Sequence, residues 1–79
     1  MKSMIKYFIY QDGHEVSVFD TTNREYIANE FNRYINGVKM LGITCHAELR
    51  MSVAGSRDII LCECIVSGGV ADYVGRSFK

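Results

Sequence analysis

Three cysteines and a histidine are the residue types in this chain that are best suited to hold a metal ion. Thiolate and imidazole, common ligands of zinc, are supplied by Cys45, His46, Cys62 and Cys64. The spacing argues against a zinc site, because C-x-C is not the C-x2-C knuckle of structural zinc sites. Alternation along a strand also places the Cys45 and His46 side chains on opposite faces. We therefore predict buried, reduced thiols and no metal, with a zinc site or a redox role as the alternatives.

A second group of residues could do acid/base chemistry. His46 and Glu48 alternate along one strand, and Glu63 is expected directly opposite Glu48 on the next strand, where like charges raise a carboxyl pKa. Arg50 and His46 flank the two carboxylates and can neutralise them, and an open sheet face has no cleft that excludes water. We predict that these charges are structural or face a partner. No catalytic residue, no cofactor and no enzymatic activity is expected.

Length and composition predict one folded domain that covers residues 1–79. The chain is 48% hydrophobic and has 9 basic and 9 acidic residues, which is typical of a globular protein and argues against disorder. A chain of 79 residues buries only about 60 to 65% of the surface of its unfolded form, so its own core is thin. We expect self-association or a partner to contribute to its stability.

The charge and hydropathy patterns argue against two classes of partner. The formal net charge is +0 and no basic stripe is present, whereas neutralising nucleic-acid phosphates requires clustered cations. The longest apolar runs, such as residues 59–62, are far shorter than the roughly 18 residues that span a bilayer. The start, MKSMIKYF, lacks the apolar core of a signal peptide. We therefore expect a cytoplasmic protein without a membrane partner, and the charge pattern argues against general nucleic-acid binding.

The first residues predict a β-hairpin. Strands are expected at about 4–11 and 14–20, and Asp12-Gly13 between them is typical of a two-residue type I′ turn. The resulting register pairs Ile9 with Val16 on the face that we expect to be core. The opposite face then carries the aromatic side chains of Phe8, Tyr10 and Phe19.

Residues 22–41 predict one long amphipathic helix. Thr22 and Glu25 have the spacing of a capping box, and Gly42 stands at the C′ position. The apolar residues recur at spacings of three and four, so they form one stripe: Ile27, Phe31, Tyr34, Ile35, Val38 and Leu41. Gly37 costs about 1 kcal/mol relative to alanine. A break at 36–37 is the alternative, and we predict the uninterrupted helix.

Residues 43–53 and 58–66 predict a second hairpin. We expect Met51 to pair with Ile60, because a shift of one residue would turn Glu63 into the core. The same register pairs Leu49 with Cys62, Ala47 with Cys64, and Cys45 with Val66.

The element after this hairpin, at about residues 69–78, is open between two structures. Val70, Tyr73 and Val74 have the spacing of a short helix, whereas Gly75 and the shortness of the segment allow an edge strand. The predicted fold class is α+β: a single β-β-α-β-β domain with a four-stranded antiparallel sheet, one long amphipathic helix on one face, and a short C-terminal helix or edge strand.

One helix covers only one side of such a sheet, so the second side needs another cover. Apolar area rimmed by charge is typical of an interaction face. Three covers stay open: the C-terminal segment as a lid, a second copy of the chain, or another macromolecule. The candidate partner- or dimer-binding residues are Phe8, Tyr10, Phe19, His46, Glu48, Arg50, Ile59, Leu61, Glu63 and Ile65.

The function we expect is therefore protein binding, as a homodimeric adaptor or a stoichiometric inhibitor of a larger protein or complex. A compact domain without catalytic motifs is typical of viral accessory proteins, by which phages and mobile elements block host enzymes or defence complexes. The alternative is a single-stranded nucleic-acid binder that stacks bases on the aromatic side chains. Other docking surfaces are the strand edges and the outer side of the helix, with Asn29, Asn32, Arg33, Asn36 and Met40.

Overall fold

The computed structural model describes residues 5–54 and 58–74, and these form one helix and one antiparallel sheet of five strands. The elements are β1 (Ile5–Gln11), β2 (His14–Phe19), α1 (Arg24–Met40), β3 (Cys45–Val53), β4 (Ile59–Ser67) and β5 (Val70–Val74). Their order across the sheet is β2-β1-β3-β4-β5. The helix α1 therefore connects the edge strand β2 to the central strand β3, which pairs with β1. The α+β class is confirmed.

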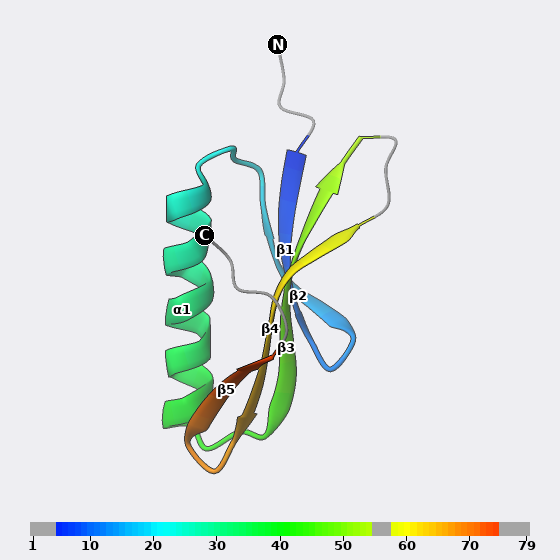
Figure 1. The fold of residues 1–79 in the computed structure, drawn as a ribbon. Coiled ribbons are helices and arrows are strands. Elements are labelled where there is room, and N and C mark those ends of the chain that lie inside the picture. Colours follow the sequence, from blue (N-terminus) through cyan, green and yellow to red (C-terminus); the bar gives the residue numbers. More distant parts are fainter. Residues whose placement is uncertain (1–4, 55–57, 75–79) are drawn as a thin grey trace.

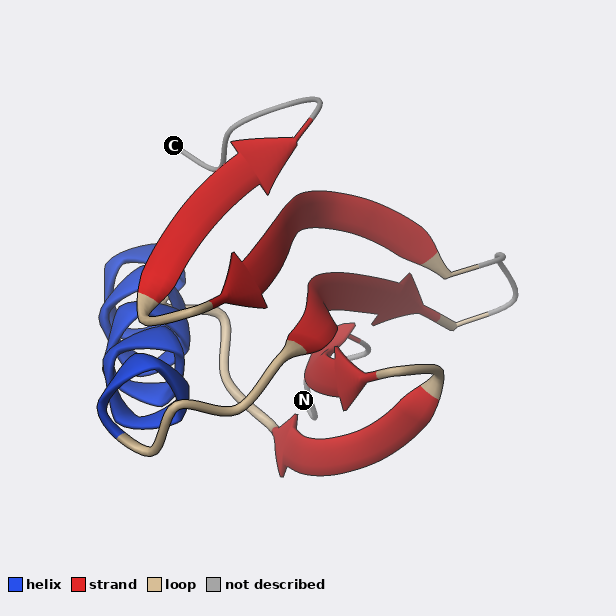
Figure 2. Cartoon of the chain, turned by 90° about the horizontal axis from the view of Figure 1, so that it is seen from below, coloured by secondary structure: helices blue, strands red, loops and turns tan. Residues whose placement is uncertain are grey.

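The helix lies along one side of the sheet, and the described residues provide no second layer on the other side (Figure 1). It packs most closely on β4 and β5. Seen along the helix in Figure 2, the sheet curves away from α1 toward β2. The β1–β2 turn, the end of β3 and the start of β4 project away from the helix, so among the described residues part of the sheet has no helical cover on either side.

The core lies between α1 and the central strands. Buried residues of the helix recur with the predicted spacing and comprise Ile27, Phe31, Ile35 and Val38. They face apolar side chains that alternate along β1, β3 and β4: Tyr7, Ile9, Cys45, Ala47, Leu49, Cys62, Cys64 and Val66. All three cysteines are free and buried, as small apolar thiols.

The helix begins one residue later than its capping box predicts. Asn23, not Thr22, is the N-cap, and its Oδ1 accepts a hydrogen bond of 3.0 Å from the backbone N–H of Tyr26. Asparagine is as good a cap as serine or threonine, so sequence alone separates the two positions poorly. The C-terminal end of the helix agrees with the predicted C′ position of Gly42, because this glycine adopts a positive φ of 71° just beyond the C-cap Leu41. Gly37 does not interrupt the helix.

The first hairpin has the predicted turn but not the predicted register. Asp12 and Gly13 both have positive φ, at 51° and 82°, as a type I′ turn requires. An irregularity between Ile9 and Tyr10 then shifts the pairing, so that Ile9 lies opposite Ser17 instead of Val16. The extra residue in β2 turns Phe19 to the helix side, where it packs against the core. Burying a phenylalanine there removes more apolar area from water than burying a valine.

The second hairpin agrees with the prediction over most of its length. The pairs Cys45–Val66, Ala47–Cys64 and Leu49–Cys62 are all present. A bulge beyond Leu49 then makes Met51 pair with Ile59 instead of Ile60. The extra residue is Leu61, which is partly buried against the core.

The segment after Ser67 is a fifth strand at the edge of the sheet, which is the second of the two structures left open for it. The count of four strands and the alternative of a C-terminal helix are wrong. Gly68 and Gly69 have positive φ of 59° and 77° and form a tight turn that pairs Val70 with Ser67. A strand satisfies its backbone along β4, whereas a helix of this length is marginal in water. The predicted element beyond residue 74 lies outside the described residues.

Candidate functional site

The side of the sheet turned away from α1 is called the outer face. The register of the five strands assigns these residues to it: Lys6, Phe8, Tyr10, Glu15, Val18, His46, Glu48, Arg50, Ser52, Ile60, Glu63, Ile65, Ser67, Val70, Asp72 and Val74. The central strand β3 presents the charged and polar side chains of His46, Glu48 and Arg50, and the apolar side chains of the face lie on the strands to either side of it. Val18 is 49% exposed at one edge and Ile65 is 46% exposed on β4.

Arg50 is the centre of the outer face. Its Nε lies 3.0 Å from Glu48 Oε1, and its Nη2 bonds to the same oxygen. The guanidinium carbon lies 4.1 Å from the centre of the Tyr10 ring, a cation–π arrangement. The hydrogen bond to Glu48 raises the pKa of Arg50 further, despite partial burial. Glu48 is only 8% exposed, so a buried carboxylate, a guanidinium and an aromatic ring form one ordered unit.

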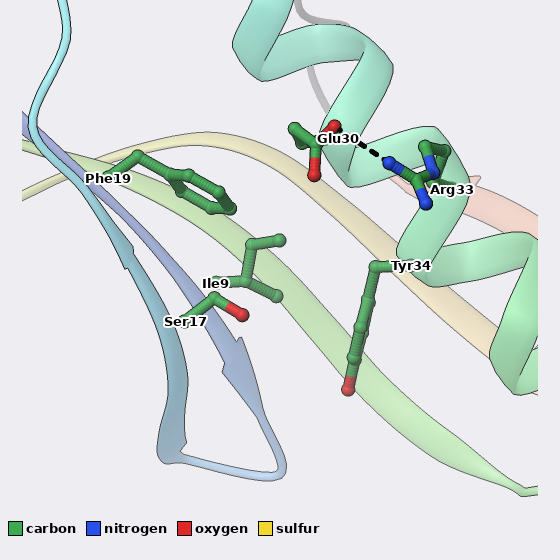
Figure 3. Close-up of a pocket in the computed structure, with 6 residues that line it drawn as sticks. All are labelled: Ile9, Ser17, Phe19, Glu30, Arg33 and Tyr34. Atoms are coloured by element: carbon green, nitrogen blue, oxygen red, sulfur yellow. Dashed lines mark hydrogen bonds and ion pairs between the residues drawn. The ribbon is translucent and has the colours of Figure 1, made fainter.

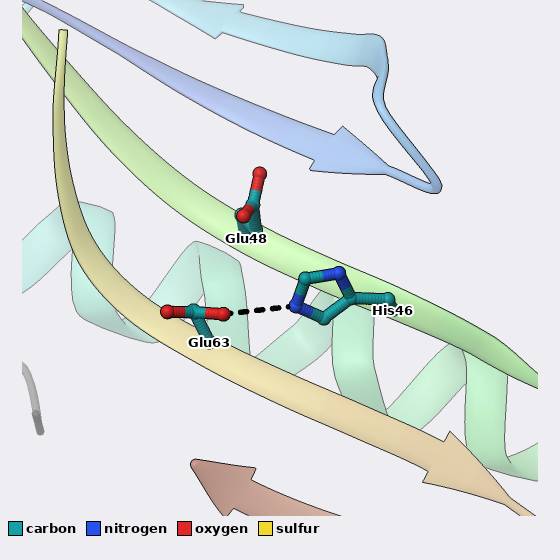
Figure 4. Close-up of side chains that lie close together, drawn as sticks. All are labelled: His46, Glu48 and Glu63. Atoms are coloured by element: carbon teal, nitrogen blue, oxygen red, sulfur yellow. Dashed lines mark hydrogen bonds and ion pairs between the residues drawn. The ribbon is translucent and has the colours of Figure 1, made fainter. Parts of the chain in front are cut away.

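A second polar pair lies beside this unit. His46 Nε2 is 3.0 Å from Glu63 Oε1, across the β3–β4 pairing (Figure 4). The β1–β2 turn holds the start of β3, because Asp12 Oδ1 accepts a 2.9 Å hydrogen bond from the His46 backbone N–H and the Asp12 N–H donates to the His46 carbonyl at 2.9 Å. Glu48 pairs with Glu63 in the register, as predicted. The backbone that carries all three acid/base groups is therefore fixed by two hairpins.

Seven of the ten predicted site residues lie on the outer face, and three do not. Phe19 and Leu61 are partly buried against the core, and Ile59, opposite Met51, belongs to the helix side of the sheet. Each of the three lies in or beyond a bulge, which moves a side chain to the other face relative to strict alternation. The residues brought together are Phe8, Tyr10, His46, Glu48, Arg50, Glu63 and Ile65.

Sequence reasoning missed four apolar members of the outer face: Val18, Ile60, Val70 and Val74. Val18 and Ile60 were assigned to the core by a hairpin register without bulges. The last two depend on β5, for which the two glycines after Ser67 are a typical two-residue hairpin turn. That signal was available in the sequence, whereas the bulges have no comparable local signature.

An open pocket of about 250 Å³ lies on the other side of the sheet, where β2 extends beyond the helix. Phe19, Ile9 and Ser17 line its strand side, and Glu30, Arg33 and Tyr34 line its helix side (Figure 3). Arg33 Nη1 and Glu30 Oε2 form an ion pair of 3.2 Å at the pocket. The Tyr34 hydroxyl donates to Gln11 Oε1. The pocket exists because one helix does not cover five strands.

The titratable groups under and beside the helix are kept in their neutral, protonated forms. Burial raises the pKa of Tyr34 to about 12, and the nearby Cys45 and Asp12 act in the same direction. Burial also raises the pKa values of the thiols of Cys45 and Cys64 and of the Tyr73 hydroxyl. Thiols whose pKa is raised by burial are poor nucleophiles at neutral pH, so this side of the sheet does not favour thiol chemistry.

Comparisons with known proteins do not assign the chain to a family: no family model, no curated protein and no solved structure matches it. Within the described residues, the helix is not long and apolar enough to cross a membrane.

Proposed function

We propose that the protein is a protein-binding module that forms a homodimer through the outer face of its sheet. The observation that carries the proposal is the ordered unit of Arg50, Glu48 and Tyr10 at the centre of a partly apolar surface. Arginine and tyrosine are the residue types that most often dominate binding at the centre of a protein interface. Because both side chains are already held in place, little conformational entropy is lost when a partner covers them.

Size and charge support a second copy as the occupant. A standard interface takes about 800 Å² from each partner, which is a small part of the 5236 Å² that one chain exposes. In a two-fold interface each copy presents the same patch, which must therefore complement itself. The outer face contains both signs of charge, and the chain has a formal net charge of +0, so two copies do not repel one another strongly.

A dimer of this kind leaves the helix and the pocket beside Arg33 and Tyr34 accessible. We propose that these surfaces contact a larger protein, for which the dimer acts as an adaptor or stoichiometric inhibitor. Single-stranded nucleic acid, the alternative occupant of the outer face, has less support. Phe19 does not contribute to the face, and Tyr10, which would stack on bases, lies between Glu15 on β2 and Glu48 on β3.

Light scattering coupled to size exclusion tests the dimer. The expected mass is twice the 9.0 kDa of one chain. Ile65→Glu and Val18→Glu place a charge on the exposed apolar parts of the outer face and should each give a folded monomer. Met40→Glu is the matched control, because Met40 is 88% exposed on the helix, and it should remain dimeric.

Two results would contradict the proposal. One is a wild-type chain that stays monomeric at every concentration examined. The other is a dimer that persists in both outer-face variants and dissociates in Met40→Glu, which would assign the interface to the helix. A gel shift with mixed single strands at low salt examines the alternative, since nucleic-acid binding should weaken steeply as salt is added.

A further inference from the structure

We propose that His46, Glu48 and Glu63 bind a divalent transition-metal ion, with Zn²⁺ as the best match to their chemistry. Each residue offers one ligand atom, and these three atoms all lie within 4.8 Å of one another. Figure 4 shows the three side chains on the two adjacent strands β3 and β4, with His46 and Glu63 pointing toward each other. The site is complete within one chain and does not depend on the proposed dimer.

His46 and Glu63 already have the spacing of two ligands of one ion. Zinc binds imidazole nitrogen and carboxylate oxygen at about 2.0 to 2.2 Å, so two tetrahedral ligands are about 3.3 Å apart. The observed separation of His46 Nε2 and Glu63 Oε1 is 3.0 Å. An ion can therefore replace the hydrogen bond between them with little movement of either side chain.

Glu48 provides the third ligand, and its hydrogen bonding leaves one oxygen available. Both Arg50 nitrogens bond to Oε1. Among the described residues, no donor reaches Oε2, although Glu48 is only 8% exposed. Buried carboxylate oxygens normally have partners. An ion would supply the partner that Oε2 lacks among the described residues, so we assign Oε2 as the ligand atom of Glu48.

Neighbouring groups orient the ligands by hydrogen bonds, as such groups do in metal proteins. Asp12 fixes the backbone of His46 through two hydrogen bonds of 2.9 Å. Arg50, itself placed over Tyr10, fixes Glu48. Since the His46 backbone and the side chains of Glu48 and Arg50 are already held in place, few further groups need to become ordered when an ion binds.

The ligand set selects the class of metal. Imidazole suits zinc and its neighbours in the transition series, whereas Mg²⁺ and Ca²⁺ prefer oxygen ligands alone. Two carboxylates outweigh the single positive charge of Arg50, so the local charge favours a cation. Three protein ligands leave a fourth position for water or for a group of a bound partner.

Calorimetric titration of the full chain with Zn²⁺, in a buffer that does not chelate metals, tests the site. We expect one ion per chain. His46→Gln and Glu63→Gln should each weaken binding at least about tenfold, because each removes a ligand. The matched controls are His14→Gln, on the exposed second histidine, and Glu15→Gln, on another carboxylate of the outer face, and both should bind as the wild type does.

A second titration with Co²⁺ separates this site from the three cysteines. Nitrogen and oxygen ligands give weak visible bands only, whereas a coordinated thiolate adds an intense near-ultraviolet band. The proposal is overturned if no saturable binding occurs, if the His14 and His46 variants lose affinity equally, or if the thiolate band appears. The titration is repeated on Val18→Glu, the expected monomer, to separate metal binding from dimer formation. Binding of Zn²⁺ by this variant supports the site whether or not the wild type forms a dimer.

Discussion

The two sides of the sheet differ although they are made by the same strands. On the helix side, Ile9 and Leu49 are almost completely shielded from water. One position along, on the outer face, Phe8 and Arg50 are in contact with solvent, and Ile65 on β4 is nearly half exposed. Alternation thus separates two tasks within each strand: one set of side chains holds the helix, and the other is available to a partner.

Polar groups on the two sides are also stabilised differently. On the helix side, neutral hydroxyls make single hydrogen bonds between helix and strands, as Tyr73 does to Asn32 Oδ1 at 3.2 Å. On the outer face, charged groups pair directly, as Arg50 does with Glu48. Stability should therefore depend mainly on the helix side, and recognition on the outer face.

The largest expected difference between the sides is in stability. Leu49→Ala opens a cavity in the core and should lower the free energy of unfolding by about 3 kcal/mol. Ile65→Ala, its counterpart on the outer face, should cost less than about 1 kcal/mol in the monomeric state, because this side chain is already nearly half exposed to water. Urea unfolding of both variants measures this. Equal losses would show that the outer face is also core.

The next effect concerns the charged unit of the outer face. Arg50→Ala leaves Glu48 nearly buried without its partner and should destabilise the chain by roughly 1 to 2 kcal/mol. Lys6→Ala, on an exposed cation of the neighbouring strand, should change stability very little. Urea unfolding at low and high salt is the measurement, and the Arg50 effect should persist at high salt because the pair is poorly screened. Similar small effects for both variants would mean that the pair does not order the face.

The smallest effect is an alkaline loss of stability that originates on the helix side. The pKa of Tyr34 is raised from 10.0 to about 12 in the folded chain, so the folded state holds this proton more tightly than the unfolded state. The resulting stability is complete below pH 10 and is lost as the pH rises through about 12. Cys45 and Cys64 act in the same direction from their ordinary value of 9.0.

Tyr34→Phe has no phenol proton to lose, so its stability should fall less than that of the wild type between pH 10 and 12. The quantity to compare is the change in unfolding free energy with pH, since the variant also lacks the hydrogen bond to Gln11 at neutral pH. Identical pH profiles for the two chains would refute this origin of the alkaline effect.

Much of the fold could be predicted because periodicity is a strong signal. The stripe from Ile27 to Val38 and the alternation from Cys45 to Leu49 both match the observed core. The bulges could not be predicted, because the extra residues in β2 and β4 are ordinary strand formers. Their positions depend on how well Phe19 and Leu61 pack on the core once the helix is in place.

The candidate site was predictable to the same extent. His46, Glu48 and Arg50 follow from alternation along β3, which has no bulge against β1. The proximity of His46 and Glu63 depends in addition on the β3–β4 register, which the cost of burying Glu63 had correctly selected at this point. The pocket beside β2 could not be predicted, since it depends on where the helix lies across five strands.

Isotope-filtered nuclear Overhauser spectroscopy on a mixture of labelled and unlabelled chains tests the central claim most directly. If the outer face is completed by a second copy, contacts between chains should connect the methyl groups of Val18, Ile60 and Ile65 with protons of the partner, and the Met40 methyl group should have none. Contacts between chains that involve only the helix, or none at all at concentrations where the chain is folded, would contradict the account.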